Sequence, residues 1–271
     1  MKDILICPVC GGTLLREEKR FVCRENHSFD IAKQGYVNLL YGKSGAIHGD
    51  NAMMIAARSR FLSAGHYAPL AEMLADRVRA YAGERTVLLD IGCGEGYYTS
   101  YAQAALGNGG EVFAFDISKD ALKATAKRCR AVLFAASAYK IPLADVSADI
   151  ATLLFSPFCR EEILRILKPS GIFIMAYPGC RHLFGLKQAI YDTPYLNRPE
   201  DTAIEGFTLL EKHDISRVIR LPDQEAIQDL FTMTPYYYKT GEKDQAKLQA
   251  LTSLETEIEF HLCVYKKNYS I

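Results

Sequence analysis

Hydrophobic residues in the central and C-terminal parts of the chain gather in short runs, separated by polar or alanine-rich segments. Apolar runs of this length are typical of buried strands, and the segments between them have the composition of helices. The pattern predicts strands at residues 86–90, 111–116, 131–136, 149–155, 171–177, 207–210 with a continuation at 216–221, and 257–265. It predicts helices at residues 51–64 with Asp50 as the cap, 68–82, 97–106, 120–130 and 161–167. This order of elements indicates an α/β fold.

The first predicted strand ends in a glycine-rich loop, which is the most informative segment of the sequence. Asp90 is followed by Gly92, Gly94 and Gly96 in the pattern D-x-G-x-G-x-G, directly before a predicted helix. Glycines at such a turn let the backbone approach a nucleotide, because no side chain blocks it. The dinucleotide fingerprint is G-x-G-x-x-G, and an acid before the loop would repel a pyrophosphate but suits a ligand with an ammonium group. A glycine-rich turn in another kind of α/β protein is the alternative.

A second acid favours the nucleotide interpretation. Asp116 ends the next strand, 20 residues after Gly96, which is the offset at which an acid accepts hydrogen bonds from ribose hydroxyls. Considered alone, an Asp at this place more often caps a helix. Together the two motifs resemble those of class I S-adenosylmethionine (SAM) methyltransferases, whose fold is a Rossmann-like sheet of seven strands ending in an antiparallel hairpin. Many of these enzymes have an adenine-binding acid where this chain has Ser137, so a hydroxyl or backbone groups would have to hold the adenine.

Another cluster of chemically informative residues lies near the N-terminus. Cys7, Cys10, Cys23 and His27 have the spacing C-x2-C-x12-C-x3-H, with a short hairpin-like segment between the two pairs. A Cys3His set gives Zn²⁺ four tetrahedral ligands and leaves no open coordination position, so the predicted metal is structural. A redox pair at Cys7 and Cys10 is the alternative, but it needs a thioredoxin-like βαβ context that this segment lacks. So small a module would fold only with the metal bound.

The overall composition limits the classes of function. The 271 residues include 32 basic and 32 acidic ones, so the zero net charge gives no sign of a general nucleic-acid binder, and any RNA contact must rely on local patches. The N-terminal apolar segment is too short for a signal-peptide core, and no apolar run reaches 18 residues. These features predict a cytoplasmic protein with no membrane partner. The remaining cysteines are scattered singly and are expected to be buried rather than disulfide-bonded.

The order of several segments gives a more specific resemblance. The zinc-binding pattern is followed by KQGYVNLL (residues 33–40), FLSAGHYAPL (61–70), DIGCGEGYYT (90–99), PGCRHL (178–183) and MTP (233–235). In this order they resemble the RlmA family of bacterial 23S rRNA (guanine-N1)-methyltransferases over nearly the whole chain. The resemblance implies methyl transfer from SAM to N1 of a guanine in a hairpin loop of 23S rRNA domain II. It also implies a zinc-binding module at residues 1–34, a helical connector and lid over the cofactor site at 35–82, and a methyltransferase domain at 83–271.

The resemblance also assigns roles to individual residues. The zinc module would be structural and would help to recognise rRNA. Gly94 and Glu95 would lie against SAM, Tyr67 would reach it from the preceding helix, and His182 from the loop after the fifth strand. Core packing is the alternative for Tyr67 and His182. The full expected SAM-binding set is Tyr67, Asp90, Gly92, Gly94, Glu95, Gly96, Asp116, Ser137 and His182.

The acceptor base is expected beside the end of the fourth strand, as in the usual layout of class I enzymes. Phe155, Ser156 and Phe158 are the candidates for this pocket, and the two aromatic rings could stack on an unpaired base. Ordinary core packing is the alternative for both rings. No acid stands in this segment, so the sequence names no catalytic base with certainty. Stacking and hydrogen bonds to the guanine edge are expected to do most of the catalytic work.

Two other functions and one assembly also fit parts of the pattern. A methyltransferase acting on a small molecule would share the core but rarely needs a zinc module. A non-enzymatic protein that binds RNA or a partner would explain the module, but it would not explain why Asp90, the three glycines and Asp116 are all intact. A homodimer would combine two weakly basic faces into one cleft.

Overall fold

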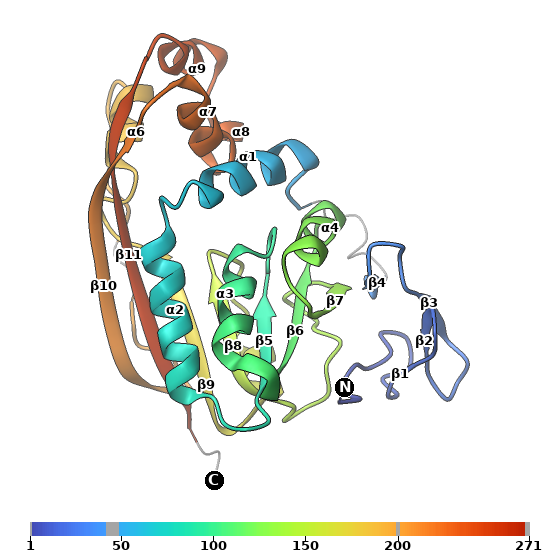
Figure 1. Ribbon diagram of the computed structural model, residues 1–271. Coiled ribbons are helices and arrows are strands. Elements are labelled where there is room, and N and C mark those ends of the chain that lie inside the picture. The colour runs from blue at the N-terminus through green and yellow to red at the C-terminus, as the bar shows by residue number, and fades with distance from the viewer. Residues whose placement is uncertain (1, 42–48, 199–200, 269–271) are drawn as a thin grey trace.

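The structure is a computed structural model that describes residues 2–41, 49–198 and 201–268. Its centre is a sheet of eight strands in the order β10-β11-β9-β8-β5-β6-β7-β4 (Figure 1). The strands are β4 (Tyr36–Asn38), β5 (Val87–Ile91), β6 (Glu111–Asp116), β7 (Val132–Ala135), β8 (Ala148–Leu154), β9 (Leu167–Pro178), β10 (Phe207–Leu221) and β11 (Leu254–Lys267). The six strands from β9 to β4 are parallel, and β11 is antiparallel to both β9 and β10.

The sheet contains the seven predicted strands and one that the pattern did not predict. The last two form the expected antiparallel hairpin, but β10 is one continuous strand instead of two segments. Its central residues are polar and face solvent at the edge of the sheet, so the hydrophobic pattern predicted two separate segments. The eighth strand, β4, comes from the expected connector, and its Val37 lies beside Phe134 of β7. Three residues are too few to show a strand period, so only the tertiary pairing reveals β4.

Helices flank the sheet and form a lobe beyond one end of it (Figure 1). They are α1 (Ala52–Ser63), α2 (Ala68–Tyr81), α3 (Tyr97–Leu106), α4 (Lys119–Arg128), α5 (Arg160–Ile166), α6 (Phe184–Ile190), α7 (Gln224–Thr232), α8 (Tyr236–Lys239) and α9 (Glu242–Gln249), with a 3-10 turn at Gly107–Gly109. The prediction that Asp50 caps α1 is wrong, because the side chain of Asn51 accepts the hydrogen bond from Met54 N at 3.0 Å. In the described part of the chain, no helix is both long and apolar enough to cross a membrane.

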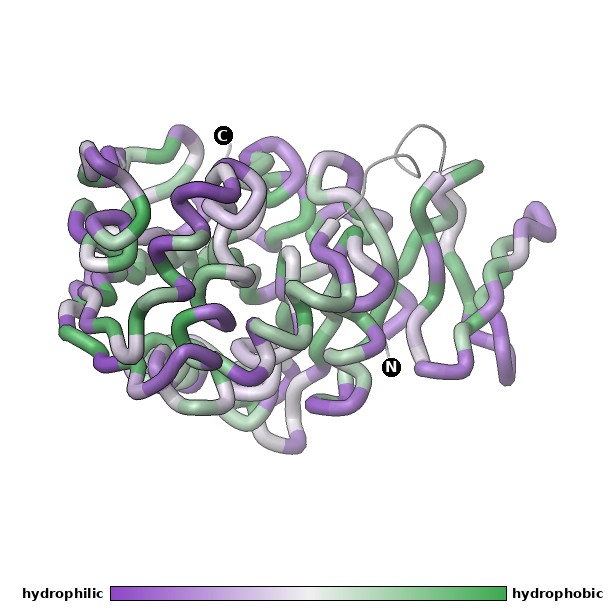
Figure 2. The backbone as a smooth tube through the Cα atoms, turned by 90° about the horizontal axis from the view of Figure 1, so that it is seen from above, coloured by the Kyte–Doolittle hydropathy of each residue, from purple (hydrophilic) through white to green (hydrophobic). Residues whose placement is uncertain are grey.

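The strands present two hydrophobic faces, because successive side chains point to opposite sides of the sheet. Leu88 of β5 and Ala114 of β6 belong to the cluster formed with α2 and α3. Leu89, Phe113 and Phe134 belong to the cluster on the other face. Seen from above, hydrophobic segments run through the interior and hydrophilic segments gather on the outer loops and helices (Figure 2). The sheet is therefore a buried platform, and its carboxyl-end loops carry the candidate site.

The zinc module lies at the β4 end of the sheet (Figure 1). Its own small sheet contains β1 (Leu15–Arg16), β2 (Arg20–Val22) and β3 (Ser28–Asp30) in sequence order. The buried side chains of Leu5, Leu14 and Phe21 join the hydrophobic cluster that contains Phe134 of the main sheet. The module thus covers part of the sheet face opposite α2 and α3, and its apolar residues extend the core of the larger domain.

Two backbone hydrogen bonds fasten the module to the loop between β7 and β8. Ile6 N donates to Pro142 O at 3.0 Å, and Ala144 N donates to Ile4 O at 2.9 Å. These bonds satisfy backbone groups that an isolated N-terminal segment would leave to water. The position of the module therefore depends on how rigidly this loop is held.

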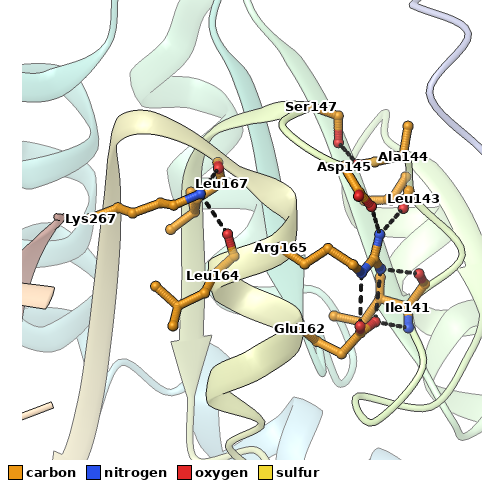
Figure 3. A network of polar contacts seen from close by, with 10 residues as sticks. All are labelled: Ile141, Leu143, Ala144, Asp145, Ser147, Glu162, Leu164, Arg165, Leu167 and Lys267. Atoms are coloured by element: carbon orange, nitrogen blue, oxygen red, sulfur yellow. Dashed lines mark hydrogen bonds and ion pairs between the residues drawn. The ribbon is translucent and has the colours of Figure 1, made fainter. Parts of the chain in front are cut away.

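The loop is held by Arg165 of α5, as Figure 3 shows. The guanidinium donates to the carbonyl oxygens of Leu143 at 2.7 Å and Ile141 at 2.8 Å, and it pairs with Glu162 and Asp145. Glu162 also accepts from Ile141 N at 2.6 Å. A planar guanidinium with five donors suits such a set of fixed acceptors. The network links α5 to the surface on which the zinc module docks.

Candidate active site and metal centre

The four predicted zinc ligands come together in the N-terminal module. Their ligand atoms all lie within 4.8 Å of one another. Cys10 Sγ lies 3.6 Å from Cys23 Sγ, and His27 Nδ1 lies 3.6 Å from Cys7 Sγ and 3.4 Å from Cys23 Sγ. Tetrahedral zinc, with Zn–S of about 2.3 Å and Zn–N of about 2.0 Å, separates its ligand atoms by roughly 3.5–3.8 Å. The residues therefore fit a structural zinc ion with no open position.

Local backbone hydrogen bonds shape the two turns that carry these ligands. Cys7 N donates to Gly12 O at 2.7 Å, Gly11 N donates to Cys7 O at 2.8 Å, and Asn26 N donates to Cys23 O at 3.0 Å. Gly11 and Asn26 have φ values of +76° and +61°, a left-handed conformation that Gly and Asn adopt more readily than other residues. The sequence between the ligands thus sets the direction in which their side chains point.

The glycine-rich loop has one open side. Gly92, Gly94 and Gly96 have φ values of +70°, +57° and +86°. A Cβ on Gly92 would overlap the side chain of Ser156, and one on Gly96 would come within 2.9 Å of Thr125 Cα, so packing alone requires these two glycines. A Cβ on Gly94 would meet no described atom closer than 3.8 Å. Gly94 is therefore the position at which a ligand can approach the backbone.

The acid before the loop is used inside the protein. Asp90 is buried at the end of β5 and accepts hydrogen bonds from Thr99 Oγ1 at 2.5 Å and Thr152 Oγ1 at 2.8 Å. These bonds join β5, β8 and the first turn of α3. Burial raises the pKa of Asp90, and the two hydroxyl donors oppose that rise. The predicted contact of Asp90 with a SAM ammonium group stays a prediction.

The second acid lies beside the open side of the loop. Asp116, at the end of β6, accepts from Gly94 N at 2.9 Å and from Ser118 N at 2.8 Å. Burial raises its pKa, while these backbone donors lower it. Each carboxylate oxygen still has a lone pair for a further donor. The position is compatible with the predicted ribose contact, which stays a prediction.

The Glu95 side chain forms an ion pair within the protein. Its buried carboxylate lies 2.5 Å from Arg128 Nε of α4. Arg128 Nη2 also donates to Ser59 Oγ and Ser63 Oγ of α1, both at 2.9 Å. Burial raises the pKa of Glu95, and the Arg128 charge opposes this. The Glu95 side chain therefore links the loop to α4 and, through Arg128, to α1, and its predicted contact with SAM stays a prediction.

A cation that the sequence did not single out lies over the loop. Arg58 of α1 forms an ion pair with Asp50 and donates to Met233 O at 3.2 Å. Its Nη1 is the atom nearest to the open side of Gly94. Nothing in the local pattern marks Arg58, since an arginine on an amphipathic helix is ordinary. The lid role of the connector stays a prediction.

Tyr67 and His182, 115 residues apart, meet in the structure. Tyr67 Oη lies 3.4 Å from His182 Nε2, and both rings pack on Phe260 with centroids 4.8 and 4.6 Å away. Burial, with a contribution from Lys187, lowers the pKa of His182 to about 3, so the imidazole is neutral. Because Nδ1 accepts from Glu259 N at 3.3 Å, the proton is on Nε2 and is donated to Tyr67 Oη. Their expected contacts with SAM stay predictions.

The structure separates the two aromatic candidates for the acceptor pocket. Phe155 follows β8 with φ of +58°, is 46% exposed, and has its ring 5.5 Å from Phe260 and 6.3 Å from Tyr98. Phe158 instead stacks on Phe173 at 5.9 Å and 14°, and Phe173 belongs to the opposite face of the sheet. Of the two rings, only Phe155 packs on Phe260, the ring on which Tyr67 and His182 also pack. Ser156, the third candidate, packs against Gly92.

Ser137 lies toward the zinc module. Its hydroxyl accepts from Tyr139 N at 3.3 Å, and its carbonyl accepts from Lys140 N at 3.1 Å. The residue lines a small groove together with Val9 of the zinc module and Leu40 of the connector. The hydroxyl thus shapes the turn after β7, and its predicted contact with adenine stays a prediction.

Sequence reasoning missed three residues of this corner. They come from separate elements: Arg58 from α1, Tyr98 from α3 and Phe260 from β11. Tyr98 lies inside the motif DIGCGEGYYT, so its position directly after the loop was a usable signal. Phe260 has the pattern of a normal core residue, and only the pairing of β11 with β9 brings it to the site.

Comparison with known proteins finds family models that match two regions of the chain. Residues 5–42 match the family model described as RlmA, N-terminal, and residues 89–175 match the model described as methyltransferase domain. A putative 23S rRNA (guanine-N(1)-)-methyltransferase of Bacillus subtilis (strain 168) is 30% identical over 280 residues, which is 96% of each chain. The 23S rRNA (guanine(748)-N(1))-methyltransferase of Streptomyces fradiae is 36% identical over 190 residues, 69% of this chain and 67% of that protein. A putative 23S rRNA (guanine-N(1)-)-methyltransferase of Micromonospora griseorubida is 37% identical over 202 residues, which is 67% of this chain and 68% of that protein.

Proposed function

The chain belongs to the RlmA family of SAM-dependent 23S rRNA (guanine-N1)-methyltransferases, and on this premise we propose that it methylates N1 of a guanine in a hairpin loop of 23S rRNA domain II. Similarity over 96% of the chain supports the reaction. The hairpin and the domain come from the resemblance of the sequence motifs. A ribosomal substrate would place the reaction in the cytoplasm.

The observation that carries the proposal is the aromatic corner between the glycine-rich loop and the segment after β8. Tyr67, Tyr98, Phe155 and Phe260 form one set of contacting rings, and Phe155 is the member that is open to solvent. Sequence-specific RNA enzymes commonly bind an unpaired base by stacking it on such rings. A base from a hairpin loop suits this corner better than a small polar metabolite.

The residues around the loop have distinct roles in this mechanism. SAM supplies a methyl group that its sulfonium already activates, so positioning is the main task of the protein. Gly94 gives the donor access to the backbone, and Asp116 accepts hydrogen bonds from the ribose. Arg58 lies where it can pair with a ligand carboxylate, and α1 covers the loop and limits the entry of water. Phe155 stacks on the acceptor guanine.

Primer extension across 23S rRNA tests the proposal directly. N1-methylguanine blocks the Watson–Crick edge and stops reverse transcriptase. Cells that lack the gene should lose a stop in the domain II hairpin, and the wild-type gene should restore it. Gly94→Val, which fills the open side of the loop, should not restore the stop, whereas Gly83→Val should, because a Cβ at Gly83 meets no described atom within 4 Å.

A stop pattern that does not depend on the gene would contradict the proposal. Labelled methyl transfer into extracted metabolites would then indicate a small-molecule acceptor. Absence of SAM binding in calorimetry would instead indicate a non-enzymatic RNA-binding or partner-binding protein. The three measurements together separate the functions that the sequence left open.

The proposal includes rRNA recognition by the zinc module and a homodimer. The module is docked on the main sheet through two backbone bonds and shared apolar residues, so RNA bound by it would be held at a fixed position relative to Gly94. Two copies would give the neutral chain a larger combined basic surface. A monomer in sedimentation at working concentration would remove the dimer from the proposal.

A further inference from the structure

One hydroxyl group in the acceptor corner has no partner within the protein. The Tyr98 hydroxyl oxygen is buried and forms no hydrogen bond with any described residue. A buried polar group without a partner costs roughly 1–3 kcal/mol, so its presence calls for an explanation, and a catalytic role is one of the known explanations. Tyr98 is the second residue of α3, directly after the glycine-rich loop.

The ring of Tyr98 lies among other aromatic rings, one of which belongs to the expected acceptor side. This ring lies 5.2 Å from that of Tyr97 and 6.3 Å from that of Phe155, which marks the expected acceptor side. Burial, followed by the proximity of Tyr67, raises the pKa of Tyr98, so the phenol keeps its proton at neutral pH and can only donate or accept as a neutral hydroxyl. The titratable and charged groups that act on it are Tyr67, Tyr97, Arg58 and Glu95.

We propose that the Tyr98 hydroxyl donates a hydrogen bond to O6 of the acceptor guanine and thereby favours loss of the N1 proton. This inference rests on the proposed function. Loss of the N1 proton moves negative charge onto O6, and a fixed donor at that oxygen stabilises the charge where it develops. Such a donor does part of the work of a carboxylate base, which the segment after β8 lacks.

The chemical step balances without a protein base. The N1 proton leaves to solvent water, and the N1 lone pair forms a bond to the methyl carbon. The bond between that carbon and sulfur breaks, and its electron pair stays on sulfur. The products are N1-methylguanine and S-adenosylhomocysteine, and Tyr98 keeps its own proton throughout.

Tyr98 suits this role better than its neighbour Tyr67. Tyr67 Oη has a partner in His182 Nε2, whereas the Tyr98 hydroxyl has none among the described residues, and the Tyr67–His182 pair is the one expected to contact SAM. The carboxylate of SAM is another oxygen acceptor that the Tyr98 hydroxyl could bind. The two acceptors have the same hydrogen-bonding chemistry, so the experiment must distinguish the methyl donor from the base.

The test compares Tyr98→Phe with the wild-type protein. This substitution removes one oxygen and keeps the ring. Tyr101→Phe, one turn further along α3, is the matched control. The measurements are SAM affinity by calorimetry, and the single-turnover rate of methyl transfer to a hairpin-loop rRNA transcript at saturating SAM across a pH series.

The expected result is a SAM dissociation constant within about twofold of wild type and a single-turnover rate lowered at least tenfold at neutral pH, since loss of one donor to a developing oxyanion costs on the order of 10²-fold. The rate defect of Tyr98→Phe should become smaller as the pH rises, because the guanine N1 then loses its proton without the hydrogen bond from Tyr98. Tyr101→Phe should change neither quantity.

Weaker SAM binding with an unchanged single-turnover rate would overturn the inference and assign the hydroxyl to the donor. Unchanged binding and rate would also overturn it and assign the hydroxyl to water. A defect of constant size across the pH series would overturn the acid-base role. If the wild-type protein itself does not methylate the transcript, the proposed function fails first and this inference fails with it.

Discussion

The zinc module and the glycine-loop corner both depend on a few polar residues, but they are built in different ways. In the module, the four ligands lie between Cys7 and His27, and local hydrogen bonds shape the turns between them. In the corner, the contacting groups come from α1, the start of α2, α3, the turn after β8 and β11, and the packing of the main core holds them in place. We therefore expect a bound metal to stabilise the first region, whereas the packing of the main core stabilises the second.

Removal of one zinc ligand should have the largest effect, because metal binding supplies most of the folding free energy of so small a module. Cys23→Ser should lower the zinc content from about one ion per chain to near zero and remove roughly 10–16 kcal/mol of apparent binding free energy. Elemental analysis and limited proteolysis of residues 1–34 would measure this. Cys159→Ser, at a cysteine outside the ligand set, should change neither result. A fully loaded, protease-resistant Cys23→Ser protein would contradict the comparison.

Substitution within the glycine-rich loop should have the next largest effect. Gly96→Ala places a methyl group 2.9 Å from Thr125 Cα at a φ of +86°, and it should lower the free energy of unfolding by about 2–5 kcal/mol. Gly94→Ala has open space and should lower it by only about 1–2 kcal/mol, while weakening SAM binding at least tenfold. Urea denaturation and calorimetry would show the contrast. Equal losses of stability at both glycines would contradict the assignment of Gly94 as the open side.

The pH dependence of the free energy of unfolding should show a smaller effect, which arises from His182 in the glycine-loop corner. Burial lowers the pKa of His182 to about 3 in the folded protein, so between that value and the ordinary value of about 6.5 only the unfolded chain binds the proton. The contribution of neutral His182 to the free energy of unfolding is therefore complete above pH 6.5, and it decreases as the pH falls below that value. The free energy of unfolding should drop by about 2 kcal/mol from pH 7 to pH 5 on this account.

His182→Gln is the variant that tests this origin. It should remove the His182 part of the slope of the free energy of unfolding against pH. The part due to His66 should stay, because burial lowers the pKa of that residue as well. Urea denaturation at each pH would measure both. An unchanged slope in His182→Gln would show that the imidazole is not neutral in the folded protein.

Substitution of Phe155 or Phe158 should have the smallest effects, and it should show which of the two rings belongs to the acceptor pocket. Phe155→Ala should weaken binding of the rRNA hairpin about fivefold, near the lower limit of roughly 1–3 kcal/mol for stacking of one base. Phe158→Ala should leave RNA binding unchanged and lower thermal stability, because its ring stacks on the buried Phe173. The reverse pattern in binding and melting measurements would restore Phe158 to the acceptor pocket.

The sequence predicted most of the fold because its strands are buried and carry near-continuous apolar runs. The metal centre was also predictable, since its ligands are close in sequence and their spacing is specific. The strand β4 was not, because three residues show no period, and β10 was predicted as two pieces because its solvent-facing residues are polar. These errors occur where tertiary pairing rather than local pattern decides the structure.

The candidate site shows the same division. The backbone positions Gly92, Gly94 and Gly96 could be named from their spacing, and the structure explains why each is glycine. The direction of charged side chains could not be predicted, since Glu95 pairs with Arg128, an interaction between the glycine-rich loop and α4. The position of Arg58 over the loop could not be predicted either, because it depends on where α1 packs. Spacing indicates where a site lies, and long-range packing decides which side chains face it.

The edge strand β4 also affects how the chain folds during its synthesis. Val37 leaves the ribosome about 100 residues before Phe134, its partner on β7, and at roughly 5–20 residues per second this separation lasts about 5–20 seconds. During this interval the cysteines and His27 are already available to zinc, whereas the sheet on which the module docks does not yet exist. Metal binding can therefore be the first folding event of the nascent chain, and closure of the sheet edge by β4 is a later one.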